Sequence, residues 1–190
     1  GQISTSYGGD MIFDVNKRET EKLIMDLERS RKDIDSHIET VKQKAKTISG
    51  YIAPPDEGMN SFINGKYQRD GYSVGKYAIM GEGNYPIPFL LFVPDDKSAR
   101  HPALIYLNQN GKAADSAPGG EIEKLVKKGY IVAATDVIGT GETKNTATRG
   151  SAEGYTGVLT GRSIVAIQAA DIVRIAAHLK TLGNVDPSKI

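Results

Sequence analysis

Blocks of apolar and polar residues in the second half of the chain predict a strand, a helix and a second strand in succession. Ala103–Leu107 and Gly129–Ala134 are short, continuous apolar runs. Runs that do not alternate with polar residues are typical of parallel strands buried on both faces. Between them, Glu121–Lys128 is amphipathic, and its apolar face carries Ile122, Leu125 and Val126. Such β-α-β units place function in the loops that follow the strands.

The N-terminal quarter shows helical periodicity over Lys17–Ile48. A helix is expected to end near Gly50 and Pro54-Pro55. Two interpretations follow: an amphipathic helix that packs on a domain or another helix, or a coiled-coil dimerisation arm. Arg31 lies among the apolar positions and favours the first. The apolar residues recur at spacings of three, four and seven, and they are Leu27, Ile34, Ile38, Val41, Ala45 and Ile48.

The middle of the chain predicts a loop and then an antiparallel hairpin. Asp56–Arg69 has little pattern and is expected to be a connecting loop with a short helical turn. Tyr72–Met80 and Tyr85–Val93 are rich in β-forming residues, and Gly81–Asn84 between them is a turn signal. Two prolines near the start of the second strand predict an outer position in the sheet.

After Thr143 the sequence predicts a polar loop to about Thr160 and then a long helix. The loop contains Arg149, Glu153 and Tyr155, and long loops of this kind are often functional. The following segment, Arg162–Leu182, has a broad apolar face that predicts packing on a sheet. Val185–Ile190 is then expected to lead into another strand.

Composition excludes several classes of protein. The 190 residues carry 24 Lys and Arg against 23 Asp and Glu, so no excess charge would attract nucleic acid. There is no cysteine for a disulfide or a thiolate metal site, and no apolar run is long enough for a membrane span. The first residue is Gly1 rather than Met, typical of a processed or recombinant start. The compartment is left open, with a periplasmic or secreted location favoured over a cytoplasmic one.

The order of these elements resembles the first half of an α/β hydrolase, specifically the acetyl xylan esterase-like carbohydrate esterases, over roughly Gly71–Ile190. The resemblance is carried by the hairpin DGYSVGKYAIMGEGNYPIPFLLFVP, by Asp136-x-x-Gly139-x-Gly141-x-Thr143, and by the Asp171-containing helix that leads to Val185-Asp186-Pro187. It implies a mostly parallel α/β sheet flanked by helices. The sheet would be incomplete, because the chain ends before the strand that leads into the catalytic serine.

The resemblance also implies where catalysis would take place. In this family a Gly-x-Ser-x-Gly turn holds the nucleophile, and the catalytic acid and histidine follow it. No such set is found here, so no catalytic residue is assigned to this chain. The loop after the third strand of the family's sheet contributes oxyanion-hole N–H groups. Its counterpart gives Asn108, Gln109 and Asn110 as candidates, although many relatives have His-Gly there. An ordinary Asn/Gly turn is the alternative interpretation.

Other chemistry finds little support in the sequence. Gly161-Arg162-Ser163 has Val165 where the second glycine of a nucleophile turn is needed, so Ser163 is interpreted as a residue of the helix N-terminus. Gly139-Thr140-Gly141-Glu142-Thr143-Lys144 lacks the third glycine of a dinucleotide loop. No metal-ligand spacing is found and no cofactor is predicted. The chain has three histidines, His37, His101 and His178, and nothing in the sequence pairs any of them with a serine and an acid.

The predicted organisation is an N-terminal tail and long amphipathic helix over 1–55, followed by the first half of an α/β-hydrolase-like domain over 56–190. The leading functional hypothesis is the N-terminal portion of a serine esterase that acts on an acylated sugar or polysaccharide. Its alternatives are a non-catalytic module for binding or assembly, and a helical interaction protein. Because Ala103–Leu107 would present an unpaired edge on the side of the missing strand, a longer chain, a second polypeptide or a homo-oligomer is expected to complete the sheet.

Overall fold

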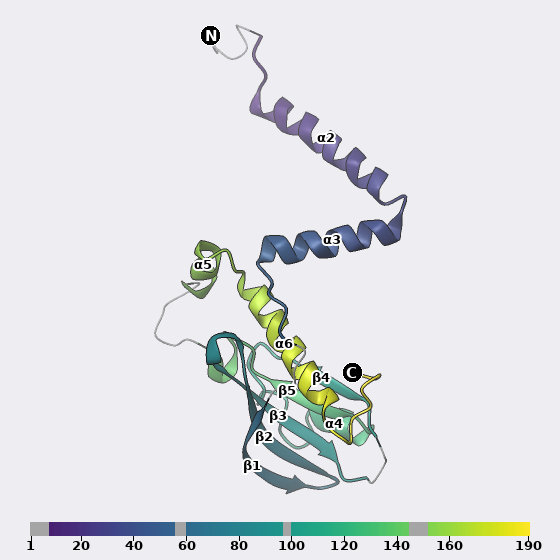
Figure 1. Cartoon of the computed structure of the whole chain (residues 1–190), viewed down its shortest axis with the longest axis vertical. Coiled ribbons are helices and arrows are strands. Elements are labelled where there is room, and N and C mark those ends of the chain that lie inside the picture. Colours follow the sequence, from purple (N-terminus) through teal and green to yellow (C-terminus); the bar gives the residue numbers. More distant parts are fainter. Residues whose placement is uncertain (1–7, 56–59, 97–99, 145–151) are drawn as a thin grey trace. The chain divides into compact units, whose positions relative to one another are not determined.

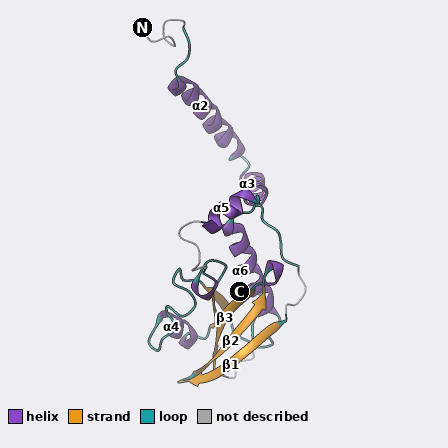
Figure 2. Cartoon of the chain, turned by 90° about the vertical axis from the view of Figure 1, so that its left-hand side faces the viewer, coloured by secondary structure: helices purple, strands orange, loops and turns teal. Residues whose placement is uncertain are grey.

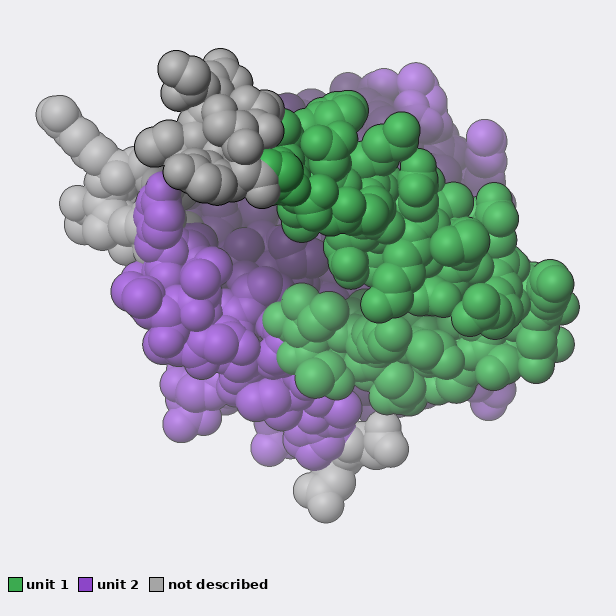
Figure 3. All heavy atoms as spheres, turned by 90° about the horizontal axis from the view of Figure 1, so that it is seen from above, with its two compact units in different colours: residues 1–48 green, residues 49–190 purple. Residues whose placement is uncertain are grey.

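The structure, a computed structural model, describes residues 8–55, 60–96, 100–144 and 152–190. The chain divides into two compact units, residues 1–48 and residues 49–190, which have separate colours in Figure 3. The first is helical and the second contains a sheet. Each unit is described by itself.

The described part of the N-terminal unit contains two helices where the sequence predicts one. They are α2 (Ile12–Ser30) and α3 (Ile34–Ser49), and neither contains a buried residue. The helix breaks because the Ser30 hydroxyl donates to the Leu27 carbonyl, and because Asp33 acts as a new N-terminal cap. The Asp33 carboxylate accepts the Ser36 N–H at 3.2 Å. Competing side-chain bonds of this kind are what end one helix and begin another.

The second unit is built on one five-stranded sheet (Figure 1). Its strand order is β1-β2-β3-β5-β4. The predicted β-α-β unit and the hairpin are both confirmed: β4 and β5 are parallel, and β2 and β3 are antiparallel in continuous register. The strands are β1 (Ser61–Arg69), β2 (Tyr72–Met80), β3 (Pro86–Pro94), β4 (Ala103–Tyr106) and β5 (Ile131–Thr135).

Three sequence expectations about the sheet need correction. The pairing is mixed rather than mostly parallel, because β1, β2 and β3 run antiparallel to their neighbours and only β4–β5 is parallel. Strand β1 replaces the predicted loop; its residues are almost all exposed, so no apolar alternation marks them. Strand β3 is central, and its prolines are tolerated because pairing with β5 begins only at Phe89.

Apolar residues on the two faces of the sheet form separate clusters. Different helices cover the two faces (Figure 2). Helix α6 (Ile164–Lys180) packs Ile175 and Leu179 against one face. Helix α4 (Glu121–Lys127) packs Ile122 and Val126 against the other, as predicted. Strands buried from both sides in this way carry continuous apolar runs rather than alternating ones.

One connection contains a helix where the sequence predicts a loop. Helix α5 (Ala152–Leu159) lies within the predicted polar loop, and its Tyr155 is exposed. Arg149 lies outside the described residues, as does the side chain of Glu153. Two short 3-10 turns complete the described elements, η1 (Glu82–Asn84) and η2 (Gly141–Thr143).

Strand β4 lies at an edge of the sheet, next to β5. The segment after α6 runs along the start of β4: His101 and Val185 form a parallel bridge, and the Ala103 N–H donates to the Lys189 carbonyl. The segment Val185–Ile190, which is expected to lead into another strand, therefore lies beside the start of β4.

Candidate functional site

The loops after β4 and β5 are joined by a buried ion pair. Lys112 Nζ lies 2.7 Å from Asp136 Oδ2, and the two side chains are 10% and 1% exposed. The Lys112 N–H also donates to Asp136 Oδ1 at 2.5 Å. Glu142 completes the group, because its N–H donates to Asp136 and its carboxylate lies 2.7 Å from Lys112 Nζ. We call Lys112, Asp136 and Glu142 the loop clamp.

Two glycines allow these loops to approach the Asp136 carboxylate. Gly111 and Gly141 both have positive φ, 93° and 48°. A Cβ on Gly141 would lie 2.3 Å from Asp136 Cγ, and a Cβ on Gly111 would lie 2.7 Å from Gly141 Cα. Any side chain at either position would therefore separate the loops, which explains the glycine on each side of the clamp.

The loop with the three oxyanion-hole candidates is held by its own side chains. Asn108 Nδ2 and the Tyr106 hydroxyl both donate to Asp115, each at 2.7 Å. The Asn110 N–H donates to Asn108 Oδ1 at 2.8 Å. Gln109, between them, is exposed, and its backbone N–H has no hydrogen-bond partner among the described residues. The loop is thus a turn held by its own hydrogen bonds, and the backbone N–H groups of Asn108 and Gln109 both lack a partner among the described residues.

Helix α6 fixes the loop after β5 from the opposite face. The buried Asp171 accepts the Ile138 N–H at 3.2 Å and the Tyr85 hydroxyl. Gln168 donates to the Ile138 carbonyl at 2.9 Å. Burial raises the pKa of Asp171, although the hydrogen bonds from Tyr85 and from the Ile138 N–H act to lower it. The loop therefore has anchors on both sides, the clamp and α6.

A second ion pair ties the start of α6 to the turn of the hairpin. The Arg162 guanidinium donates to both carboxylate oxygens of Glu82, at 2.7 and 2.8 Å. The hydrogen bonds from Arg162 hold the pKa of Glu82 below its usual value. The pair is partly exposed, at 20% and 34% of the two side chains, so solvent screens it.

We expect Glu82→Gln to lower the free energy of unfolding at pH 7 by about 0.5–1 kcal/mol. A carboxylate whose folded pKa is depressed stabilises the fold above its unfolded pKa, near 4.5, and loses that contribution as the pH falls through the folded value. The difference between variant and wild type should therefore shrink below pH 4.5 in urea titrations. Glu121→Gln is the control, since its pair with Lys124 is at least half exposed on both sides. A pH-independent difference would contradict the assignment.

Ser163 caps α6, as the sequence analysis expected. Its Oγ accepts the Ala166 N–H at 3.1 Å. Two of the histidines make contacts within the fold. His101 is buried, 2.9 Å from the Gly129 carbonyl and 3.2 Å from Asp96. His178 packs edge-on against Phe89. His37, in the helical unit, lies 3.0 Å from the Ser30 hydroxyl.

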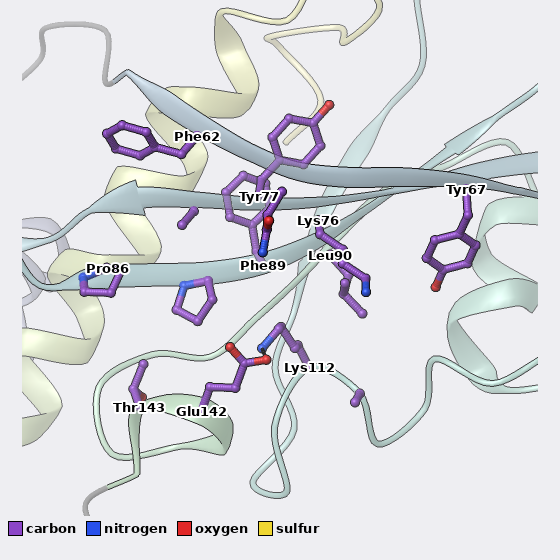
Figure 4. A pocket seen from close by; sticks show the side chains of 14 residues that line it. Phe62, Tyr67, Lys76, Tyr77, Pro86, Phe89, Leu90, Lys112, Glu142 and Thr143 are labelled. Atoms are coloured by element: carbon purple, nitrogen blue, oxygen red, sulfur yellow. Dashed lines mark ion pairs between the residues drawn. The ribbon is translucent and has the colours of Figure 1, made fainter.

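A cleft of about 490 Å³ lies beside the clamp (Figure 4). The sheet supplies one wall and the clamp loops supply the other, through Lys112 and Glu142. Polar and aromatic side chains both reach it, which is the usual character of a small-ligand site. The residues from the sheet are Phe62, Asn64, Tyr67, Lys76, Tyr77, Ala78, Pro86, Pro88, Phe89 and Leu90.

The clamp was not identified from sequence, although signals for it were present. Both Gly111-Lys112 and Gly141-Glu142 place a glycine before a charged residue in a loop that follows a buried strand. Asp136 was already part of the motif that carries the family resemblance.

Within the described residues, no three acidic or histidine side chains converge as a metal site requires. None of the described helices has the length and apolar character needed to span a bilayer.

Comparison with known proteins gives matches only to solved structures. No family model and no curated protein matches the chain. A candidate acetyl xylan esterase from Bacteroides fragilis matches 84% of the chain with a TM-score of 0.65 and 20% identity. An acetyl xylan esterase from a Paenibacillus species matches 78% with a TM-score of 0.57 and 21% identity. A glucuronoyl esterase from Solibacter usitatus matches 73% with a TM-score of 0.51 and 16% identity.

The chain spans less than half of each of these proteins: 46%, 48% and 45% of their lengths, in the same order. The structural matches confirm the resemblance to acetyl xylan esterase-like α/β hydrolases at the level of the fold. What the chain reproduces is an incomplete version of that fold.

Proposed function

We propose that this chain is the N-terminal portion of a serine-esterase-like α/β hydrolase that acts on acylated carbohydrate. The nucleophile, the base and the acid would come from residues outside this chain. A serine would attack the ester carbonyl, a histidine would take its proton, and backbone N–H groups of this chain would bind the oxyanion.

The position of the Asn108 loop supports this proposal. It follows β4, the strand parallel to β5, and active sites of open α/β sheets lie beyond the carboxyl ends of parallel strands. The N–H groups of Asn108 and Gln109 have no partner among the described residues, and an oxyanion donor needs only a backbone N–H. The clamp holds the loop in place without occupying either donor. Gln109 is exposed whereas Asn108 is partly buried, so we assign the oxyanion role to the Gln109 N–H among the three candidates.

A non-catalytic binding or assembly module is the second candidate, and one observation favours it. Three successive N–H groups of the same loop already have partners: Asn110 and Gly111 donate to Asn108, and Lys112 donates to Asp136. Oxyanion holes usually combine two or more donors. Of the N–H groups from Asn108 to Lys112, only those of Asn108 and Gln109 then remain available among the described residues.

The free side of β4 supports completion of the sheet by further residues, either of a longer chain or of a second polypeptide. Because the Pro102 carbonyl accepts the Ile131 N–H, even-numbered residues of β4 bond toward β5 and odd-numbered residues bond away from it. His101 and Ala103 pair with the segment Asn184–Lys189, whereas Ile105 extends past it. An edge of this kind readily accepts another strand.

The test is hydrolysis of 4-nitrophenyl acetate by the purified protein with any polypeptide that accompanies it, followed by fluorophosphonate labelling and mass spectrometry. We expect turnover, and a label on a serine outside residues 1–190. Ser163→Ala is the matched control: it should retain turnover and lose about 1 kcal/mol of stability as a helix cap. Absence of both turnover and label would favour the non-catalytic module, and a label on Ser163 would refute the assignment of the nucleophile.

A further inference from the structure

Strand β1 directs two aromatic side chains to the same face of the sheet, although their spacing would not do so in a regular strand. Phe62 and Tyr67 are five residues apart, and an odd separation puts side chains on opposite faces. Here Phe62 pairs with Ala78 and Tyr67 pairs with Val74, and both partners lie on the same face of β2. The register shift between Ile63 and Lys66 produces this result.

The bulge depends on a residue suited to it. Between the two paired stretches lie Asn64 and Gly65, and Gly65 has φ 129°, which favours glycine. Bulges often redirect a side chain toward a functional surface. This one turns Phe62 toward the side of the sheet that carries Lys76.

Both rings line the cleft beside the loop clamp, and both are accessible. Phe62 is 58% exposed and Tyr67 is 37% exposed. Figure 4 shows Lys112 and Glu142 across the cleft from the sheet. Neither ring belongs to either apolar cluster of the unit. The two rings therefore do not contribute to the packing of the core.

The polar groups around the rings suit a sugar. A pyranose ring has apolar C–H faces that stack on aromatic rings and a rim of hydroxyls that need donors and acceptors. Asn64 and Lys76 supply donors on the sheet side. Glu142 supplies an acceptor, because its side chain is 72% exposed although Lys112 holds it. The volume of about 490 Å³ falls within the range of small-ligand sites, roughly 300–1,000 Å³.

We propose that this cleft is a subsite for the polysaccharide chain, in which Phe62 and Tyr67 stack on sugar rings. The substrate class rests on the proposed esterase function, whereas the location of the subsite rests on the register of β1 and the cleft. The subsite binds the uncharged chain of the substrate through these two rings and the polar rim.

The test is calorimetric titration of the protein with xylohexaose. The Phe62→Ala/Tyr67→Ala double variant should bind at least about tenfold more weakly than wild type, since two ring contacts are lost. Ile63→Ala is the matched control: Ile63 is adjacent, is 60% exposed and is not among the residues that line the cleft. Its affinity should equal that of wild type. Circular dichroism should show both variants folded, because the replaced side chains are exposed.

The outcomes separate this inference from the esterase proposal. If wild type binds xylohexaose and the double variant does not, the subsite stands even where no ester is hydrolysed. If esters are hydrolysed but the double variant binds like wild type, the subsite is overturned and the esterase proposal survives. An equal loss in Ile63→Ala, or no saturable binding by wild type, also overturns it.

Discussion

Replacement of Asp136 by Asn should lower the free energy of unfolding by about 3–5 kcal/mol, the usual cost of breaking one side of a buried ion pair. Asp136 is 1% exposed and accepts bonds from the Lys112 N–H, Lys112 Nζ and the Glu142 N–H. An amide presents one acceptor and directs its NH₂ group at the remaining donors. The largely buried ammonium of Lys112 would then lose the buried carboxylate of Asp136 and keep only the exposed carboxylate of Glu142.

Urea unfolding at pH 7 measures this loss, and Glu142→Gln provides the control from the same clamp. Glu142 contacts the same ammonium at 2.7 Å, but its side chain is 72% exposed. Its replacement should cost less than about 1 kcal/mol, as for an exposed ion pair. Equal losses for the two variants would show that burial does not govern the clamp.

Gly141→Ala should lower the free energy of unfolding by about 2–4 kcal/mol, from backbone strain together with a clash in a packed site. At φ 48° an L-residue is strained, and the new Cβ would lie 2.3 Å from Asp136 Cγ. The Asp136 side chain cannot move without losing Lys112. The same change should open the loops beside the cleft and thus weaken any ligand that contacts Glu142.

Gly83→Ala is the control for strain alone. Gly83 also has positive φ, 71°, but a Cβ there would meet nothing within 4 Å. Its replacement should cost about 1 kcal/mol. The difference between the two alanine variants in thermal and urea unfolding then measures the close approach of the loop to Asp136. Identical losses would refute that approach.

Periodicity predicted the strands that are buried and failed for the strand that is exposed. Strands β4 and β5, helix α4 and the β2–β3 hairpin all have continuous or amphipathic apolar patterns, because the sheet is covered on both faces. Strand β1 has no such pattern, since almost every residue in it is exposed and its bulge breaks the alternation. Sequence periodicity detects burial, so an exposed strand is missed.

The break between α2 and α3 and the clamp show a second limit. Apolar spacing continued across Arg31, whereas the end of α2 was decided by hydrogen bonds of Ser30 and Asp33. Lys112 and Asp136 are 24 residues apart, and only the parallel pairing of β4 and β5 brings their loops together. Long-range polar contacts of this kind follow from topology and cannot be found from local pattern.

The exposure of β1 would separate ligand binding at the proposed subsite from folding. Substitutions at Phe62 or Tyr67 would change the surface offered to a ligand while leaving both apolar clusters intact. Surface changes of this kind usually alter stability by less than about 0.5 kcal/mol. Side chains along this strand could therefore be exchanged at little thermodynamic cost, whereas changes in the clamp or in the central strand β3 would disturb buried contacts. The β1 edge of the sheet is thus a surface that can vary without altering the core.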